Sequence, residues 1–105
     1  STMKFLKNDE VLYVNQHSVD NRQVLKQNNQ AVWVATDPKN GDKFIAIFNL
    51  GDKKRTITFN LELESLRGDF KVRDLWEKKD LGNVNGELSA NIESHGGKIY
   101  RLKKI

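Results

Sequence analysis

Hydrophobic residues recur in short runs from residue 31 onward, and these runs predict β-strands. Residues 56–61 alternate, with Ile57, Phe59 and Leu61 on one face and polar side chains on the other, as in a half-buried strand. Residues 44–48 are apolar at every position, which predicts a central strand covered on both faces. The other predicted strands are residues 31–36, 69–73, 88–92 and 99–102, with a further short strand at 24–25.

Turn residues separate these runs at short intervals. Asn40-Gly41 can adopt the positive φ angles of a tight turn, and Gly51 and His95-Gly96-Gly97 mark two more turns. Short strands at regular spacing indicate an antiparallel β fold rather than an α/β fold. We therefore predict an all-β antiparallel β-sandwich of the Greek-key type, with six to eight strands.

The N-terminal residues have a different pattern, which predicts a helix over residues 4–14. Asn8 or Asp9 can act as its N-cap, and Phe5 can pack back onto Leu12. Such a short helix is not stable alone in water, so we expect it to dock on another element. The polar residues 15–29 are expected to connect the helix to the sandwich, which divides the chain into residues 1–22 and residues 23–105.

The stretch from residue 73 to residue 82 is expected to form a structured corner between two strands. Its apolar side chains, Leu75, Trp76 and Leu81, can fold over the end of a sheet. Asp74 and Asp80 can close the turn by accepting hydrogen bonds from backbone N–H groups. In the connection over residues 62–68, we likewise expect Leu63 and Leu66 to plug the core.

Composition narrows the function classes. The chain has 105 residues, of which 37% are hydrophobic and 30% charged, as in one ordinary soluble domain. The net charge of +4 comes from basic residues dispersed among acidic ones, which argues against a nucleic-acid partner. No apolar run approaches the roughly 18 residues of a membrane span. The absence of cysteine rules out disulfides and thiolate chemistry.

Candidate catalytic and metal-binding groups are sparse. His17 and His95 lie far apart and in no ligand spacing, so we expect no metal site and no cofactor. We expect His95 to hydrogen-bond to backbone, and His17 to cap the preceding helix or line a cleft. Asp74, Glu77 and Asp80 lie on a polar turn where nothing would raise the pKa of one of them, so we interpret the aspartates as turn-closing groups and predict no catalytic residue.

The two tryptophans, Trp33 and Trp76, are the remaining candidates for a site. An exposed indole can stack on a sugar ring, whereas a buried indole fills a core. Burial is the favoured interpretation for both, with Trp76 expected to be the more exposed because it lies at the corner. Both are retained as candidate carbohydrate-binding residues.

The order of several motifs is more specific than any one of them. Residues 8–16 read Asn-Asp-Glu-Val-Leu-Tyr-Val-Asn-Gln, Val32-Trp33 follows, and a strand runs from Gly41 to Asn49. Residues 73–82 read Arg-Asp-Leu-Trp-Glu-Lys-Lys-Asp-Leu-Gly, and the chain closes with His95-Gly96 and residues 100–102, Tyr-Arg-Leu. In this order the motifs resemble the end of family 27 glycoside hydrolases, the α-galactosidase (melibiase) clan.

The resemblance implies a non-catalytic C-terminal β-sandwich, with residues 1–22 as the last helix of the catalytic barrel and a linker. The barrel would be its partner, and both catalytic aspartates would lie upstream, so no catalytic residue is carried over. The alternative is a carbohydrate-binding module for galactose-containing oligosaccharides that uses an exposed tryptophan. A sandwich from an α-amylase-type enzyme is the second choice of fold.

The chain departs from the family 27 pattern at one place. After Asn15-Gln16 many family 27 members read Asp-Pro-Leu-Gly, whereas this chain reads His17-Ser18-Val19-Asp20, so the sugar that the parent enzyme acts on is left open. We expect the parent to be exported, to the periplasm or outside the cell.

Overall fold

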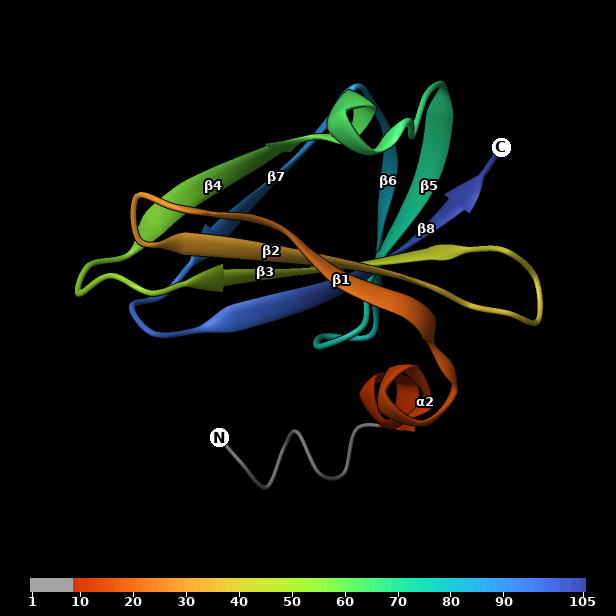
Figure 1. The fold of residues 1–105 in the computed structure, drawn as a ribbon, viewed down its shortest axis with the longest axis horizontal. Helices are drawn as coiled ribbons and strands as arrows, with labels where there is room; N and C mark the ends of the chain where they lie inside the picture. The colour runs from red at the N-terminus through yellow and green to blue at the C-terminus, as the bar shows by residue number, and fades with distance from the viewer. Residues whose placement is uncertain (1–8) are drawn as a thin grey trace.

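The computed structural model describes residues 9–105, apart from the side chains of Leu12 and Asn15. This part of the chain forms eight β-strands, one α-helix and one 3₁₀ turn (Figure 1). The elements are α2 (Asp9–His17), β1 (Val19–Gln27), β2 (Gln30–Thr36), β3 (Lys43–Asn49), β4 (Arg55–Asn60), η1 (Leu61–Glu64), β5 (Asp69–Asp74), β6 (Lys79–Asn85), β7 (Glu87–Ile92) and β8 (Gly97–Lys104).

The strands form two sheets in which all neighbours are antiparallel. Six strands pair in the order β1-β2-β3-β8-β5-β6, and β4 pairs with β7 in a separate two-stranded sheet. The last strand, β8, lies between β3 and β5, so the chain leaves the large sheet twice and returns to its centre. The predicted antiparallel sandwich is confirmed.

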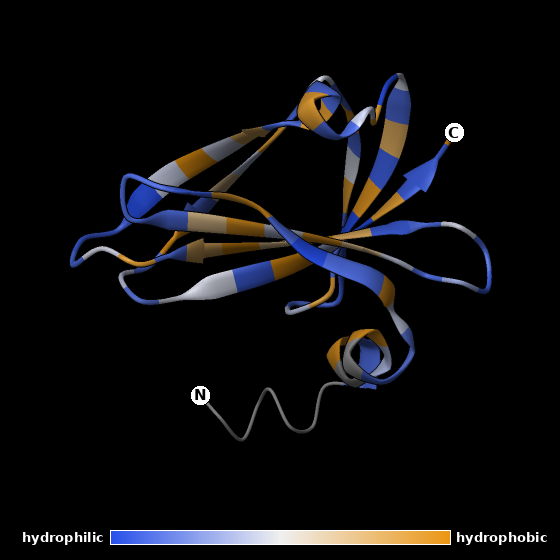
Figure 2. Cartoon of the chain, in the orientation of Figure 1, coloured by the Kyte–Doolittle hydropathy of each residue, from blue (hydrophilic) through white to orange (hydrophobic). Residues whose placement is uncertain are grey.

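The main core fills the space between the two sheets. Ile57 and Phe59 on β4 and Leu61 at the start of η1 are buried, as the alternation predicted, and the bands of Figure 2 show the same alternation along β5. Alternate residues of each strand point to the same face, so the inner face of the large sheet is apolar in every central strand. Its buried members are Val32, Val34, Ile45, Ile47, Phe70, Val72, Tyr100 and Leu102.

A second, smaller core lies on the opposite face of the large sheet, where α2 packs (Figure 1). The apolar side of α2 faces the sheet in Figure 2. The buried residues of this second core are Val11 and Val14 from the helix, Ala35 and Phe44 from the sheet, and Leu75 from the β5–β6 turn. Apolar packing on both faces of β3 agrees with the prediction of a central strand covered on both sides.

Two strands were missed or underestimated, and both are edge strands of the large sheet. Residues 15–29 were expected to be a connection with a short strand at 24–25, but β1 is a nine-residue strand with two irregularities in its register. β6 was not predicted at all. Both strands are largely exposed on both faces, and only Val24, Leu25 and Val84 pack against the main core, so the sequence of neither strand shows a sustained alternation.

The expectations about four leucines had mixed outcomes. Leu75 and Leu66 are buried, as predicted, but Leu63 is 67% exposed and Leu81 is 49% exposed. In the β5–β6 pairing Val72 faces Gly82 while Arg73 faces Asp80, so Leu81 is the extra residue of a β-bulge. The bulge turns its side chain into solvent.

The helix runs from Asp9 to His17, three residues beyond its predicted end, and the backbone N–H of Ser18 donates to the carbonyl of Val14. Asp9 lies within the helix. The proposed Asn8 cap and the Phe5–Leu12 contact lie outside the described residues. The predicted division at residue 22 falls within β1 and stays a prediction.

Candidate functional site on the outer face of the large sheet

The two tryptophans lie on the face of the large sheet that carries α2, but in different settings. Trp33, on β2, is 41% exposed, whereas Trp76, in the β5–β6 turn, is partly buried against the second core. The favoured interpretation of Trp33 as a core residue is therefore wrong, as is the expectation that Trp76 is the more exposed. Period-two alternation places Trp33 opposite in direction to Val32 and Val34, and hence outside the main core.

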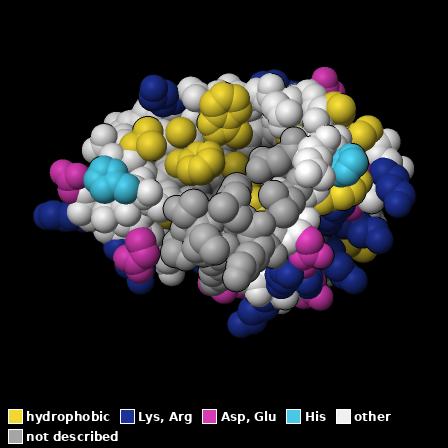
Figure 3. Space-filling view, turned by 90° about the horizontal axis from the view of Figure 1, so that it is seen from below, with side chains coloured by type: hydrophobic (Ala, Val, Ile, Leu, Met, Phe, Trp, Pro, Cys, Tyr) yellow, Lys and Arg dark blue, Asp and Glu magenta, His cyan; other side chains and the backbone are white. Residues whose placement is uncertain are grey.

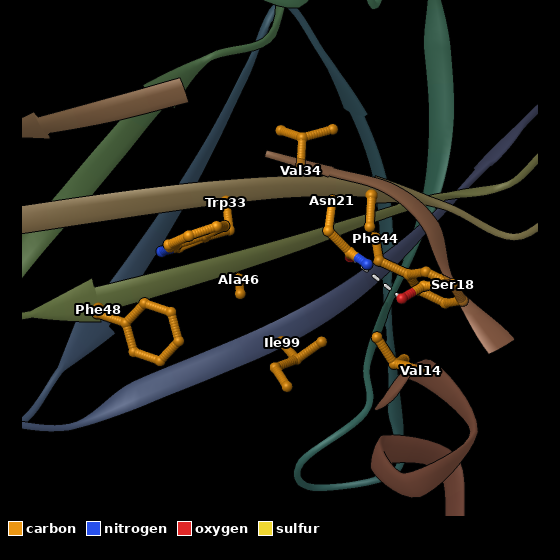
Figure 4. A pocket seen from close by; sticks show the side chains of 10 residues that line it. Val14, Ser18, Asn21, Trp33, Val34, Phe44, Ala46, Phe48 and Ile99 are labelled. Atoms are coloured by element: carbon orange, nitrogen blue, oxygen red, sulfur yellow. Dashed lines mark hydrogen bonds between the residues drawn. The ribbon is translucent and has the colours of Figure 1, made fainter. Parts of the chain in front are cut away.

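Trp33 forms one wall of a shallow groove beside α2, which we call the outer groove. It has a volume of about 300 Å³. Hydrophobic side chains are exposed on this face in the space-filling view of Figure 3, and Figure 4 shows those that line the groove. The lining residues are Val14, Ser18, Asn21, Trp33, Val34, Ala35, Phe44, Ala46, Phe48 and Ile99. Trp76 does not line the groove.

Charged contacts attach α2 to the end of the sheet next to this groove. The Arg73 guanidinium donates from Nε and Nη2 to the two carboxylate oxygens of Glu10, at 2.8 and 3.0 Å. Arg73 also donates from Nη1 to Asp80, at 3.0 Å, and Lys78 Nζ lies 2.7 Å from the carboxylate of Asp9. The hydrogen bonds from Arg73 lower the pKa of Glu10. A two-pronged contact of this kind fixes the direction of the helix as well as its position.

A second network joins α2 to β8 and to the turn between β2 and β3. The Tyr13 hydroxyl donates to Oδ1 of Asp37 at 2.9 Å. Arg101 Nη1 donates to Asp37 Oδ2 at 3.1 Å and to Asp42 Oδ2 at 2.8 Å, and its guanidinium lies 4.7 Å from the centre of the Phe44 ring. Burial favours a higher pKa for Asp37, but hydrogen bonds from the Lys39 amide, Tyr13 and Arg101 lower it. Both aspartates are buried and paired with one arginine.

Sequence reasoning did not find these two networks. Arg73 and Arg101 both stand in the motifs that carry the family resemblance, yet neither was assigned a partner. The Tyr13–Asp37 and Arg101–Asp37 contacts join residues 24 and 64 positions apart. The fold brings these groups together, so no local pattern in the sequence predicts that they pair.

The carboxylates of the corner have different roles. Asp74 Oδ1 accepts from the backbone N–H groups of Trp76 and Glu77, at 2.9 and 3.0 Å, so the turn-closing prediction for Asp74 is confirmed. Asp80 pairs with Arg73 instead, because the bulge places it opposite that residue in the hairpin. Neither carboxylate is arranged as one of a pair facing a substrate.

The histidines lie apart in the fold. His95 Nε2 lies 3.1 Å from the Asp52 carboxylate on the surface. This hydrogen bond is to a side chain and not to the expected backbone group. His17 ends α2, with its ring centre 4.6 Å from that of Tyr13. Within residues 9–105, no three histidine or acidic side chains are grouped so that they could hold a metal ion. None of the helices in this range is long and apolar enough to span a membrane.

Comparison with known proteins identifies the architecture. A family model described as the α-galactosidase C-terminal β-sandwich domain matches residues 27–102. The chain belongs to this family. The chain is 33% identical to an α-galactosidase of Cyamopsis tetragonoloba over 107 residues, covering 97% of this chain and 26% of that protein. It is 32% identical to an α-galactosidase of Coffea arabica, covering 97% of this chain and 28% of that protein.

Solved structures agree with the family assignment. A family 27 β-L-arabinopyranosidase from Geobacillus stearothermophilus superposes with a TM-score of 0.91 at 33% identity, covering 99% of this chain and 24% of that chain. α-Galactosidase I from Mortierella vinacea has a TM-score of 0.87 at 21% identity, which supports the fold alone. The chain spans about a quarter of the length of the relatives it matches, and its counterpart in them is a C-terminal domain of family 27 enzymes.

Proposed function

We propose that this chain is a non-catalytic accessory domain that packs on the catalytic barrel of a family 27 glycoside hydrolase and stabilises it. The observation that carries the proposal is the attachment of α2 to the sandwich. Val11 and Val14 are buried in the second core, while Glu10 and Tyr13 are held by arginines and an aspartate of the sheet and its turns. The segment that resembles the last barrel helix is therefore anchored to the sandwich through both apolar and polar contacts.

This anchoring explains how a sandwich could stabilise a barrel without contacting substrate. A helix of nine residues has little stability of its own, so its packing partner determines whether it forms. If α2 is also the last helix of the barrel, the sandwich holds in place the segment that closes the barrel. Undoing the closure would then require the contacts of α2 with the sandwich to break as well.

The relatives support a structural role for the sandwich domain and argue against a role in choosing the sugar substrate. Similar sandwiches occur in enzymes named as α-galactosidases and in one named as a β-L-arabinopyranosidase. The identity to one enzyme of each kind is 33%, although the named sugars differ. A domain shared in this way is better explained by a common scaffold than by recognition of one sugar.

Three carboxylates of this chain are poorly suited to act as the acid of a glycosidase. A glycosidase acid needs a pKa raised towards neutral pH. The pKa values of Asp9, Glu10 and Asp37 are instead shifted downward; hydrogen bonds to Lys78 and Arg73 lower the first two. We expect the purified chain not to hydrolyse aryl α-galactosides, and turnover that persists after rigorous purification would contradict this.

The stabilising role is tested in the full-length enzyme that contains this domain. Arg73→Met removes the clamp on Glu10 while keeping a long apolar stem, and Arg67→Met makes the same change at an exposed position in the η1–β5 connection. We expect Arg73→Met to speed thermal inactivation several-fold with kcat and KM unchanged at low temperature, and Arg67→Met to behave as wild type. A changed KM without a change in thermal inactivation would contradict the proposal and indicate a role at the active site.

Carbohydrate binding is the second candidate function, and the exposure of Trp33 favours it. Its indole is 41% exposed in the outer groove, with Ser18 and Asn21 also lining the groove as polar residues. An NMR titration with galactose, melibiose and galactomannan oligosaccharides would follow the indole N–H signals of Trp33 and Trp76. The accessory role predicts no change up to millimolar sugar. Saturable shifts at either indole would instead support a binding module.

A further inference from the structure

The outer groove has a defined shape that the anchoring of α2 does not explain. Trp33 on β2 pairs with Ala46 on β3, and Ala46 pairs with Ile99 on β8, so a small residue lies between two large ones. Phe48 lies two positions from Ala46 on the same face of β3 and pairs with Gly97. Figure 4 shows Ala46 between the Trp33, Phe48 and Ile99 side chains. The result is a hole with Ala46 as its floor.

Gly97 helps to keep this hole open. A Cβ atom at this position would lie 2.5 Å from Cδ1 of Phe48 and 2.8 Å from its Cε1. A side chain there would force the Phe48 ring away from β8 and over its own strand, where Ala46 lies. The absence of a side chain therefore lets the Phe48 ring lie beside the hole as a wall and not across it.

The size of the groove suits an α-helix. Its walls stand on β2 and β8, two strand spacings or about 9.6 Å apart. An α-helix with its side chains is about 10–12 Å across, and packed helices lie about 8–10 Å apart. One helix, α2, already lies on this face and contributes Val14 to the groove. A second helix beside α2 would lie over this face with one side chain over Ala46.

The chemistry of the groove suits an apolar side chain. Eight of the ten lining residues are Val, Trp, Ala, Phe or Ile, and none is charged. The two polar residues, Ser18 and Asn21, are hydrogen-bonded to each other through their side chains at 3.1 Å. A sugar ring needs several hydrogen-bonding groups around an aromatic platform, whereas an aliphatic side chain needs only an apolar hole. The described lining favours the aliphatic occupant.

We infer that the outer groove is the seat of a second helix of the catalytic domain, amphipathic and packed beside α2, which inserts an aliphatic side chain over Ala46. The inference rests on the proposed function and names the partner segment. Continuity supports it, because α2 precedes the sandwich in the chain and occupies the same face. The known relatives are about four times as long as this chain, and the domain they share with it is C-terminal, so their additional length lies on the side from which α2 enters.

The test places a single thiol in the hole. The chain has no cysteine, so Ala46→Cys introduces one reactive group, and Thr58→Cys introduces a control on the exposed face of β4. Maleimide labelling of each site is measured on its peptide by mass spectrometry, in the 105-residue chain and in the full-length enzyme. We expect labelling at residue 46 to be at least about tenfold slower in the full-length enzyme, the change that 1.4 kcal/mol of protection gives. Labelling at residue 58 should be equal in both.

A photo-crosslinker attached to the thiol at residue 46 then identifies the occupant. We expect a crosslink to one peptide of the catalytic domain with apolar residues at i, i+3 or i+4, and i+7. Each alternative occupant gives a different result that would overturn the inference: a crosslink to residues 1–8, protection that rises with protein concentration through a second copy, or protection by millimolar galactose. Equal labelling in both proteins would also overturn it. In that case the Arg73→Met experiment still decides the accessory role, because it does not depend on the groove.

Discussion

The packing of the corner can be tested by the same leucine-to-alanine substitution at a buried position, Leu75, and at an exposed position, Leu81. Both leucines lie in the stretch from residue 73 to residue 82, but Leu75 is 1% exposed and Leu81 is 49% exposed. Replacing a fully buried leucine by alanine costs about 2–5 kcal/mol, because the side chain loses its burial and leaves a cavity. Leu75 lies in the smaller core, between α2 and the sheet, so we expect about 3 kcal/mol for Leu75→Ala. The exposed Leu81→Ala should stay within about 0.5 kcal/mol.

The difference between the two variants is a substantial fraction of the stability of a domain of this size. A chain of this length has a free energy of unfolding of roughly 5–15 kcal/mol. With an m-value of about 2 kcal/mol per molar urea, Leu75→Ala should lower the midpoint by roughly 1.5 M and Leu81→Ala by less than about 0.3 M. Unfolding is followed by circular dichroism, with tryptophan fluorescence as a second probe. Equal shifts for the two variants would refute the assignment of Leu75 to a core shared by helix and sheet.

Three further predictions concern single groups. Asn49→Ala should cost about 2–3 kcal/mol in urea unfolding, because the buried side chain bonds the carbonyls of Lys53 and Ile92 and the Gly51 amide; a loss below 1 kcal/mol would show that water replaces these bonds. Trp76→Ala should cost about 2 kcal/mol, less than full burial would give, because its indole only partly joins the second core; an unchanged midpoint would place it on the surface. The lowered pKa of Asp37 means that its charge stabilises the fold above the ordinary aspartate value of 3.8, and that this stability is lost as the pH falls below it. Asp37→Asn should therefore be less stable at neutral pH and lose part of the acid dependence, and an unaltered acid limb of the stability profile would contradict this.

The sequence predicts best the strands that have one face in a core. Alternation over residues 56–61 and 88–92 places Ile57, Phe59, Leu88, Ala90 and Ile92 inward, and all of them are buried. Period-two burial is a local property, so one sequence is enough to recognise it. The same method does not recognise the edge strands β1 and β6, because most of their side chains are exposed on both faces and only Val24, Leu25 and Val84 pack against the main core.

The candidate site is harder to predict because it depends on a third layer. Trp33 alternates out of the main core, but sequence periodicity does not say whether the face it points to is covered. Phe44 and Trp33 both lie on this outer face. The second core at one end of the face, to which α2 contributes, buries Phe44, whereas Trp33 stays exposed. The pairing of Arg101 with Asp37 and Asp42 likewise depends on β8 lying beside β3, which is a matter of topology and not of local pattern.

A sheet that is apolar on both faces requires three layers, and residues 9–105 supply two and part of a third. The small sheet of β4 and β7 covers the inner face, and α2 covers one end of the outer face. Covering the rest of that face would stabilise the fold without any contact with substrate. On this view, substitutions at Ala46 or Phe48 should alter the stability of the complete enzyme and leave its choice of sugar unchanged. That separation would let one sandwich accompany enzymes named for different sugars, because its interface constrains the packing layer and not the active site.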